Sequence, residues 1–365
     1  MRVKLEDVCV RGSSNLKQSD VIDKTGEYPI YGAAGYIGNV DFYHQDQPYV
    51  AVIKDGAGIG RTSLYPAKSS VIGTMQYLLP KENVLPEYLC YVVKYMRLEK
   101  YFTGATIPHI YFKDYKKEEF NLDTLDRQKE IVNILGRIEC VISSRQQELQ
   151  KLDELIKARF VEMFGDPVAN DMGWNTLPLE KACKSIVDCP HSTPSYTNED
   201  TGFMCIRTSI VKKNKILWDD IEYIPEDEFV KRIQRKKPEV GDIVYTREGA
   251  ILGIAAIIDR DCNVALGQRS MLLSPDIDKC TSAFVCVAMN SDSFLDNVLK
   301  GVSGSASPHI NVGDIKAFRM IMPPVELQKQ FSDFVNQVYK SKVAVQKALD
   351  ETQLLFDSLM QEYFG

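Results

Sequence analysis

Long apolar runs and clustered metal-binding residues are both missing from this 365-residue sequence. No run approaches the roughly 18 apolar residues that a membrane-spanning helix needs. The first residues, MRVKLEDVCVRGSS, also lack the apolar stretch of a signal peptide. The nine cysteines contain no CxxC pair, and the four histidines are not clustered near them. We therefore expect a cytoplasmic protein with reduced thiols, no disulfide framework, no metal site and no membrane contact.

An excess of basic residues is missing too, because the formal net charge is -6. This charge argues against a protein that coats nucleic acid through bulk attraction to phosphates. Specific binding is still allowed, since a local basic patch or a basic partner can supply the phosphate contacts.

What the sequence does contain is an internal repeat. Thr103–Ile110 reads TGATIPHI and Ser303–Ile310 reads SGSASPHI, at an offset of 200 residues. The offset persists to the pairs Asp114/Asp314, Gln128/Gln328, Leu149/Leu349 and Phe164-Gly165/Phe364-Gly365. The chain thus contains two copies of one unit, over about 1–165 and about 175–365. The framework is kept in both copies while the loop sequences differ. Two domains that recognise different sequences would show this pattern, and so would gene duplication followed by neutral divergence.

Upstream the two copies match at a different offset, as expected when loops vary in length. Asp55–Ala57 resembles Glu248–Ala250, and Gly73–Leu79 resembles Gly267–Leu273 without a gap. In this alignment Gln268 and Arg269 correspond to Thr74 and Met75.

Each unit begins with short alternating apolar runs, such as Tyr49–Ile53 and Asp242–Thr246, separated by Gly, Pro and Asn turns. Each then ends in a long helical segment. We therefore predict an α+β fold. Its parts are a mixed, strand-rich domain over residues 1–122, a central helix within 123–170, a second strand-rich domain over 171–322 and a C-terminal helix over 323–365.

The helical segments carry a coiled-coil stripe, because apolar residues recur at alternating steps of three and four. Leu125–Phe164 contains no proline, and Gly165-Asp166-Pro167 ends it. Polar residues interrupt the stripes at Arg145, Lys342 and Thr352. The positions expected to pack in the seam are Ile131, Leu135, Ile138, Ile142, Leu149 and Leu152 in the first helix, and Val335, Val338, Val345, Leu349 and Phe356 in the second.

A lone helix with so narrow a stripe needs a partner. The simplest partner is the helix of the other copy, which gives an antiparallel pair with approximate two-fold symmetry and holds the two strand-rich domains a fixed distance apart. The alternative is an ordinary helical hairpin in the core of a larger domain.

This duplicated layout resembles the specificity subunit of a type I restriction–modification system. The TGATIPHI and SGSASPHI segments, the helices that begin near Gln-Lys, and Phe164–Pro167 followed by Gly173-Trp174 carry the resemblance. It implies that each strand-rich domain is a target recognition domain that reads half of a bipartite site in double-stranded DNA. It also implies that the helices set the spacing and dock two methyltransferase subunits, which use S-adenosylmethionine. Restriction subunits can join the complex.

Motifs for catalysis by this chain are absent. There is no Asn-Pro-Pro-Tyr tetrapeptide for extruded-base chemistry, and Met322–Val325 (MPPV) lacks both the polar residue and the aromatic one. Gly56–Gly60 is not GxGxxG, and no Lys-Ser/Thr follows it, so we expect a turn between strands. We predict a non-catalytic subunit that binds no cofactor itself.

DNA contacts are expected from loop residues with cationic or amide side chains. The run Lys231–Lys237 has five basic residues in seven and is the strongest phosphate patch. The candidates are Lys54, Arg61, Thr62, Thr74, His109, Lys113, Arg207, Ser209, Lys231, Arg232, Arg235, Lys236, Arg247, Gln268, Arg269 and His309. The TGATIPHI and SGSASPHI loops differ just before Pro-His, so their contacts can differ between the halves. The alternative function is a coiled-coil scaffold without base readout, in which these residues are solvated surface groups.

Overall fold

A computed structural model describes residues 1–21, 23–103, 108–302 and 308–365. By internal contacts the chain divides into two compact units. Unit 1 comprises Met1–Gln147 with Gln346–Gly365, and unit 2 comprises Glu148–Val345. Within the residues described, no helix is both long and apolar enough to cross a membrane.

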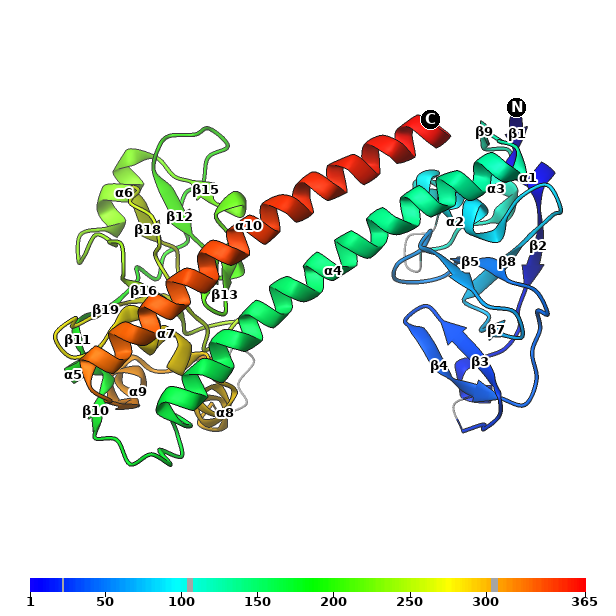
Figure 1. The fold of residues 1–365 in the computed structure, drawn as a ribbon. Helices are drawn as coiled ribbons and strands as arrows, with labels where there is room; N and C mark the ends of the chain where they lie inside the picture. Colours follow the sequence, from blue (N-terminus) through cyan, green and yellow to red (C-terminus); the bar gives the residue numbers. More distant parts are fainter. Residues whose placement is uncertain (22, 104–107, 303–307) are drawn as a thin grey trace. The chain divides into compact units, whose positions relative to one another are not determined.

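Unit 1 is built from short strands and helices, followed by parts of two long helices (Figure 1). Its strands are β1 (Arg2–Lys4), β2 (Cys9–Ser13), β3 (Tyr28–Gly32), β4 (Gly35–Val40), β5 (Tyr49–Ile53), β6 (Thr62–Tyr65), β7 (Ser70–Val71), β8 (Met75–Pro80) and β9 (Glu119–Asn121). Its helices are α1 (Leu5–Val8), α2 (Pro86–Tyr95), α3 (Phe112–Tyr115), the first part of α4 (Leu125–Phe164) and the last part of α10 (Val325–Phe364).

Unit 2 repeats this plan with additional elements. Its strands are β10 (Thr176–Pro178), β11 (Cys183–Asp188), β12 (Met204–Ile206), β13 (Val211–Lys212), β14 (Lys215–Ile216), β15 (Glu222–Tyr223), β16 (Ile243–Thr246), β17 (Ala255–Ile257), β18 (Val264–Leu266), β19 (Ser270–Pro275) and β20 (Arg319–Ile321). Its own helices are α5 (Leu179–Ala182), α6 (Glu226–Arg232), α7 (Ser282–Met289), α8 (Asp292–Lys300) and α9 (Val312–Ala317).

The sheets of the two units have the same strand order. The order β2-β8-β5-β6 in unit 1 corresponds to β11-β19-β16-β17 in unit 2, and both sheets are antiparallel. The smaller sheets β4-β3-β7 and β15-β12-β18 each combine one antiparallel and one parallel pair. A two-stranded ladder pairs β1 with β9, and another pairs β10 with β20. The repeat in the sequence is therefore a repeat of topology.

Strand register corrects one part of the sequence alignment. Leu78 pairs with Val50, and Leu273 pairs with Ile243 at the corresponding place, so Leu78 matches Leu273 and not Leu272. The ungapped match of Gly73–Leu79 to Gly267–Leu273 is thus wrong by one residue. Unit 2 has an extra residue in the turn before β19, and Arg269 there has a φ of 75°.

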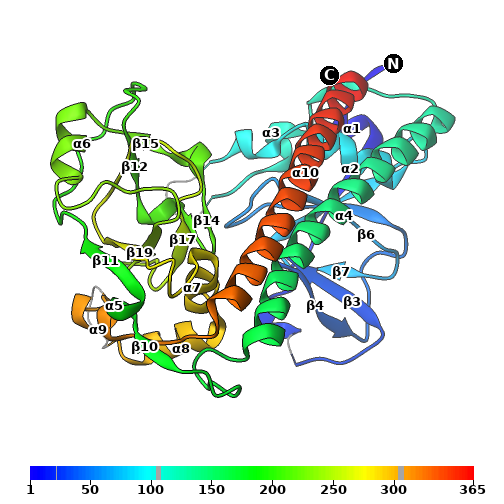
Figure 2. The same cartoon turned by 60° about the vertical axis from the view of Figure 1, so that its left-hand side comes forward.

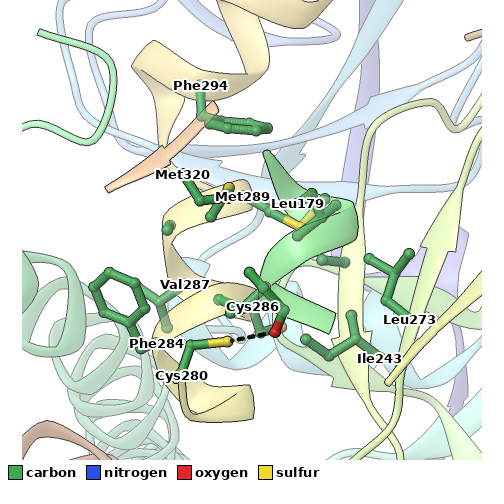
Figure 3. Close-up of a cluster of buried hydrophobic side chains, with 14 of the residues drawn as sticks. Leu179, Ile243, Leu273, Cys280, Phe284, Cys286, Val287, Met289, Phe294 and Met320 are labelled. Atoms are coloured by element: carbon green, nitrogen blue, oxygen red, sulfur yellow. Dashed lines mark hydrogen bonds between the residues drawn. The ribbon is translucent and has the colours of Figure 1, made fainter. Parts of the chain in front are cut away.

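The unit 2 core lies between its larger sheet and the helices, and Figure 2 shows α7 beside β17. Figure 3 shows Cys286 of α7 between Phe284 on one side and Ile243 and Leu273 of the sheet on the other, and all four lie in one buried cluster. Cys280 lies in the same cluster and donates its thiol hydrogen to the carbonyl of Ala182 at 3.2 Å. Seven of the nine cysteines are buried. Burial raises the pKa of thiols such as that of Cys280 to about 12, so these thiols stay protonated and unreactive.

The predicted pairing of the long helices is seen within each unit. In unit 1, Ile131 and Leu135 near the start of α4 share a core with Met360 and Phe364 near the end of α10. In unit 2 the end of α4 shares a core with the start of α10, which is again antiparallel. There the Phe160 ring lies 5.5 Å from that of Phe331.

The seam prediction agrees with the observed burial. Ile131, Leu135, Val335, Val338 and Val345 are buried, and the remaining predicted positions are half-buried: Ile138, Ile142, Leu149, Leu152, Leu349 and Phe356. The boundary between the units falls within both α4 and α10, so each unit includes a part of both helices. At one interruption, Lys342 forms an ion pair with Asp153 at 2.5 Å, which gives the cation a partner on the facing helix.

Two equivalent glutamines attach the long helices to the strand-rich parts. Gln128 is fully buried, accepts a hydrogen bond from the Leu85 amide at 2.8 Å and donates to the carbonyls of Asn83 and Asp123. Gln328 repeats the arrangement with the Thr281 amide and the carbonyls of Lys279 and Pro323. The Gln-Lys match in the sequence thus marks a structural joint.

Replacing Gln128 with leucine is expected to lower the free energy of unfolding by about 1–3 kcal/mol, because the half-buried Leu85 amide loses its acceptor and the carbonyls of Asn83 and Asp123 lose their donor. The matched control is Lys129→Leu at the next position, where the side chain is exposed. Chemical denaturation of both variants measures the difference. Equal stabilities would show that the joint contributes nothing.

Candidate nucleic-acid interface

Three chain segments meet at one place in unit 1, held by backbone hydrogen bonds. The Gly56 amide donates to the Pro108 carbonyl at 3.0 Å, and the Ile110 amide donates to the Lys54 carbonyl at 3.0 Å. The Lys54 amide in turn donates to the Thr74 carbonyl at 3.0 Å. We call this the unit 1 junction. It joins the glycine turn after β5, the turn before β8 and the Pro-His-Ile segment.

Unit 2 contains the same junction. The Gly249 amide donates to the Pro308 carbonyl at 3.2 Å, and the Ile310 amide donates to the Arg247 carbonyl at 2.9 Å. The Arg247 amide donates to the Arg269 carbonyl at 3.0 Å. The repeated Pro-His-Ile motif therefore closes each glycine turn through its backbone. Arg269 occupies the place that Thr74 has in unit 1.

Glycine is required in these turns by their backbone conformation. Gly60 has a φ of 80°, and a Cβ atom there would lie 2.6 Å from the backbone nitrogen of Glu99. Gly249 has a φ of 91°. Both angles are in the left-handed region that glycine adopts without steric penalty.

The unit 1 junction brings together Lys54, Thr74 and His109 from the predicted set. His109 Nδ1 contacts the Asp55 carboxylate, and the Lys54 amine lies 3.7 Å from the same carboxylate. Burial and the positive charge of Lys54 lower the pKa of His109. The contact of His109 with Asp55 lies within the junction, next to the hydrogen bond between Gly56 and Pro108.

The other unit 1 candidates differ in their surroundings. Arg61 is exposed, and its Nη2 donates to the carbonyl of Ala33 at 2.9 Å. Thr62 is buried and donates its hydroxyl to the Gly60 carbonyl at 3.1 Å, so it holds the turn. The hydroxyl of Thr74 is buried as well. Lys113 on α3 is exposed, with its amine 5.0 Å from the centre of the Tyr111 ring.

Sequence reasoning missed an aromatic group beside Arg61. Tyr36 of β4 has 63% of its surface exposed and lies 6.2 Å from Tyr31, which itself stacks on Tyr65 at 4.1 Å. An exposed tyrosine can stack on an unpaired base or contact sugar and methyl groups. The signal in the sequence is the density of tyrosines around the turn between β3 and β4.

In unit 2 the junction borders a cavity of about 280 Å³. The cavity brings together four predicted residues: Arg207, Ser209, Gln268 and Arg269. Its remaining lining is Tyr196, Thr208 and Glu248–Ile251.

The polar groups around this cavity are partly paired. Arg207 forms an ion pair with Glu222, and its guanidinium lies 5.5 Å from the centre of the Tyr196 ring. The Gln268 side-chain carbonyl accepts a hydrogen bond from the Thr193 hydroxyl at 3.1 Å. Arg269 is exposed.

The run Lys231–Lys237 is predicted to be the strongest phosphate patch, and the prediction of a DNA contact is wrong for its member Arg232. Its side chain is fully buried, donates from Nε to Glu228 at 2.6 Å and from Nη2 to the Ser192 carbonyl at 2.8 Å. These bonds fix α6 to the segment after β11. Arg232 is thus a structural residue with no surface to offer a phosphate.

The other members of this run are more accessible, with one exception. Lys231 and Arg235 are exposed, and Arg235 donates to the Asp188 carbonyl at 3.1 Å. Lys236 is more enclosed and pairs with Asp242 at 2.9 Å and with Glu239 at 3.1 Å. Lys237 is also exposed and donates to the side-chain carbonyl of Asn263 at 3.1 Å, so the run offers three exposed cations, at Lys231, Arg235 and Lys237.

The prediction of a DNA contact is also wrong for Arg247. Its side chain is 7% exposed and pairs with Asp188 at 3.1 Å and Glu248 at 2.6 Å. It also donates to the Ile310 carbonyl, so its guanidinium supports the unit 2 junction from inside. His309 lies opposite Glu248, as His109 lies opposite Asp55. The predicted difference between the loops at 104–107 and 303–307 falls outside the described residues.

Two copies of one strand-rich fold, with the same backbone junction but different polar side chains around it, define a duplicated recognition protein. The sequence profile described as "Type I restriction modification DNA specificity domain" matches residues 1–154 and 187–352, which is more than half of the chain. The chain therefore belongs to the family of type I restriction–modification DNA specificity proteins.

Individual relatives agree with this membership. The chain is similar to the type I restriction enzyme MjaVIII specificity subunit of Methanocaldococcus jannaschii, with 22% identity over 311 residues that cover 79% of this chain and 72% of the relative. The MjaIX specificity subunit of the same organism is 20% identical over 306 residues, covering 78% and 69%.

Solved structures show the same fold. The type I restriction–modification system S subunit from M. genitalium matches with a TM-score of 0.60 and 14% identity, covering 100% of this chain and 96% of that one. A chain from a structure that describes complex assembly and conformational transition of the type I R-M system gives a TM-score of 0.53 at 16% identity, covering 100% and 97%.

Proposed function

We propose that this chain is the DNA specificity subunit of a type I restriction–modification complex, in which each strand-rich domain reads one half of a bipartite site in double-stranded DNA. The observation that carries the proposal is the pair of equivalent junctions with different side chains. The unit 1 junction has Lys54 and an uncharged Thr74 whose hydroxyl is buried, whereas the exposed Arg269 stands at the Thr74 position in unit 2. Equal frameworks with unequal polar groups are what recognition of two different half-sites requires.

The chain itself would perform no catalysis. Modification would be carried out by two methyltransferase subunits that bring S-adenosylmethionine, and restriction subunits would join them for cleavage. Exposed apolar residues on the long helices support a role in docking protein partners. Val161 on α4 is 56% exposed, and Val343 and Leu354 on α10 are 70% and 71% exposed. Such residues are candidates for burial in a larger assembly.

Methylome sequencing of a host that expresses this chain with its cognate methyltransferase subunit tests the proposal. We expect a new bipartite motif, methylated on adenine in both halves, that is absent when this chain is omitted. A stable complex with no new methylation would contradict the proposal. It would favour the alternative in which the helices serve only as an assembly scaffold.

A further inference from the structure

We propose that Arg269 reads a guanine in the half-site of the second recognition domain, with Gln268 beside it as an auxiliary contact. This inference rests on the proposed function, since it assumes that unit 2 binds DNA. Beyond that function, it names the base that is recognised and the side chain that recognises it.

The first support is the position of Arg269. The turn before β19 is one residue longer than its counterpart before β8, and Arg269 has the left-handed φ of 75° that the longer turn requires. A non-glycine residue in this region carries a steric cost, and such residues are concentrated at functional sites. The turn thus places a long cationic side chain where unit 1 has only Thr74.

The second support is the state of the guanidinium groups near the cavity. Arg207 is paired with Glu222, and Arg247 is paired with Asp188 and Glu248. Within the described parts of the chain, the Arg269 guanidinium has neither an ion pair nor a hydrogen bond. It extends along Gly249, since a Cβ atom added there would lie 3.5 Å from Nη1 of Arg269. All of its donors are therefore available to a ligand.

The lining of the cavity suits the edge of a base better than a phosphate group. A phosphate site collects hydrogen-bond donors and positive charge, but the lining of this cavity also includes the Glu248 carboxylate, which is 26% exposed. Arg247 offsets part of the charge of this carboxylate, but its oxygens are acceptors, and a phosphodiester has no donor to offer them. The edge of a base pair presents donors and acceptors together, which suits a lining of Arg269, Gln268 and Glu248. Arginine donates two parallel N–H groups to O6 and N7 of guanine, the commonest specific contact in the major groove.

The test uses the full chain assembled with its methyltransferase subunit and duplexes that carry the bipartite motif found by methylome sequencing. Each guanine in turn is replaced with 7-deazaguanine, which lacks the N7 acceptor, or with another base pair. The proteins are the wild type, R269A, R269K and the control K300A, which removes an exposed charge from α8. Competition binding and its salt dependence are measured for each.

We expect the wild type to lose roughly 5- to 150-fold in affinity when one particular guanine of the second half-site is replaced. R269A should be indifferent to that replacement, while its discrimination in the first half-site stays unchanged. R269K keeps the charge but loses the paired donors, so it should also fail to discriminate. K300A should behave as the wild type.

A uniform loss of affinity for all duplexes in R269A, with a shallower salt dependence that R269K restores, would identify a phosphate contact and overturn the inference. Unchanged discrimination in R269A would overturn it as well, while leaving the proposed function intact. If the wild-type complex prefers no bipartite duplex, the proposed function fails first, and this inference fails with it.

Discussion

Truncating Phe160 to alanine is expected to lower the free energy of unfolding of unit 2 by about 3–5 kcal/mol. The ring is 1% exposed and lies 5.1–5.5 Å, centre to centre, from the rings of Phe164, Phe284 and Phe331. These rings come from α4, α7 and α10, so one truncation opens a cavity where three helices of unit 2 meet. Chemical denaturation followed by circular dichroism gives the change.

The control is the next residue. Val161 is 56% exposed, and Val161→Ala removes apolar atoms without opening a cavity. It should change stability by less than about 0.5 kcal/mol. If the two variants unfold at the same denaturant concentration, the aromatic cluster is not what holds the helices in unit 2.

Replacing Arg232 with alanine should be similarly damaging, at about 3–5 kcal/mol, because the largely buried Glu228 loses its buried cation and keeps only the exposed Lys231 at 3.7 Å. The double variant Arg232→Met/Glu228→Gln removes both charges and should recover part of the loss. Thermal unfolding of the single and double variants measures this.

Lys231→Ala is the matched control, because Lys231 lies 3.7 Å from the same Glu228 but is 61% exposed. An exposed ion pair contributes at most about 1 kcal/mol. If Arg232→Ala unfolds like Lys231→Ala and only binds DNA more weakly, the assignment of Arg232 as a structural residue is wrong.

Periodicity and duplication made much of the fold predictable. The 40-residue bounds of α4, Leu125–Phe164, agree with the proline-free segment and its terminal Gly-Asp-Pro. The seam positions follow from the heptad because helix packing depends on local spacing. The α+β class followed from short alternating runs that precede each helix.

The site residues were harder to predict because their state depends on distant partners. Arg232 and Arg235 are neighbours in one basic run, yet Arg232 is buried by contacts to Ser192, 40 positions away. Arg247 is likewise neutralised by Asp188. The one-residue error in aligning the two copies also depends on the folded structure. The extra residue in the turn before β19 is accommodated by the left-handed backbone at Arg269, and the sequence alone does not show where the alignment needs a gap.

The junctions use amide and carbonyl groups, which every residue other than proline supplies. The side chains of Thr74 and Arg269 take no part in these backbone hydrogen bonds, although the left-handed backbone at Arg269 favours glycine there. Changes of chemistry at these positions therefore leave the hydrogen bonds that close each turn in place. Single substitutions at these two positions can therefore change the target of the subunit with little loss of stability. Each recognition domain can change in this way independently of the other.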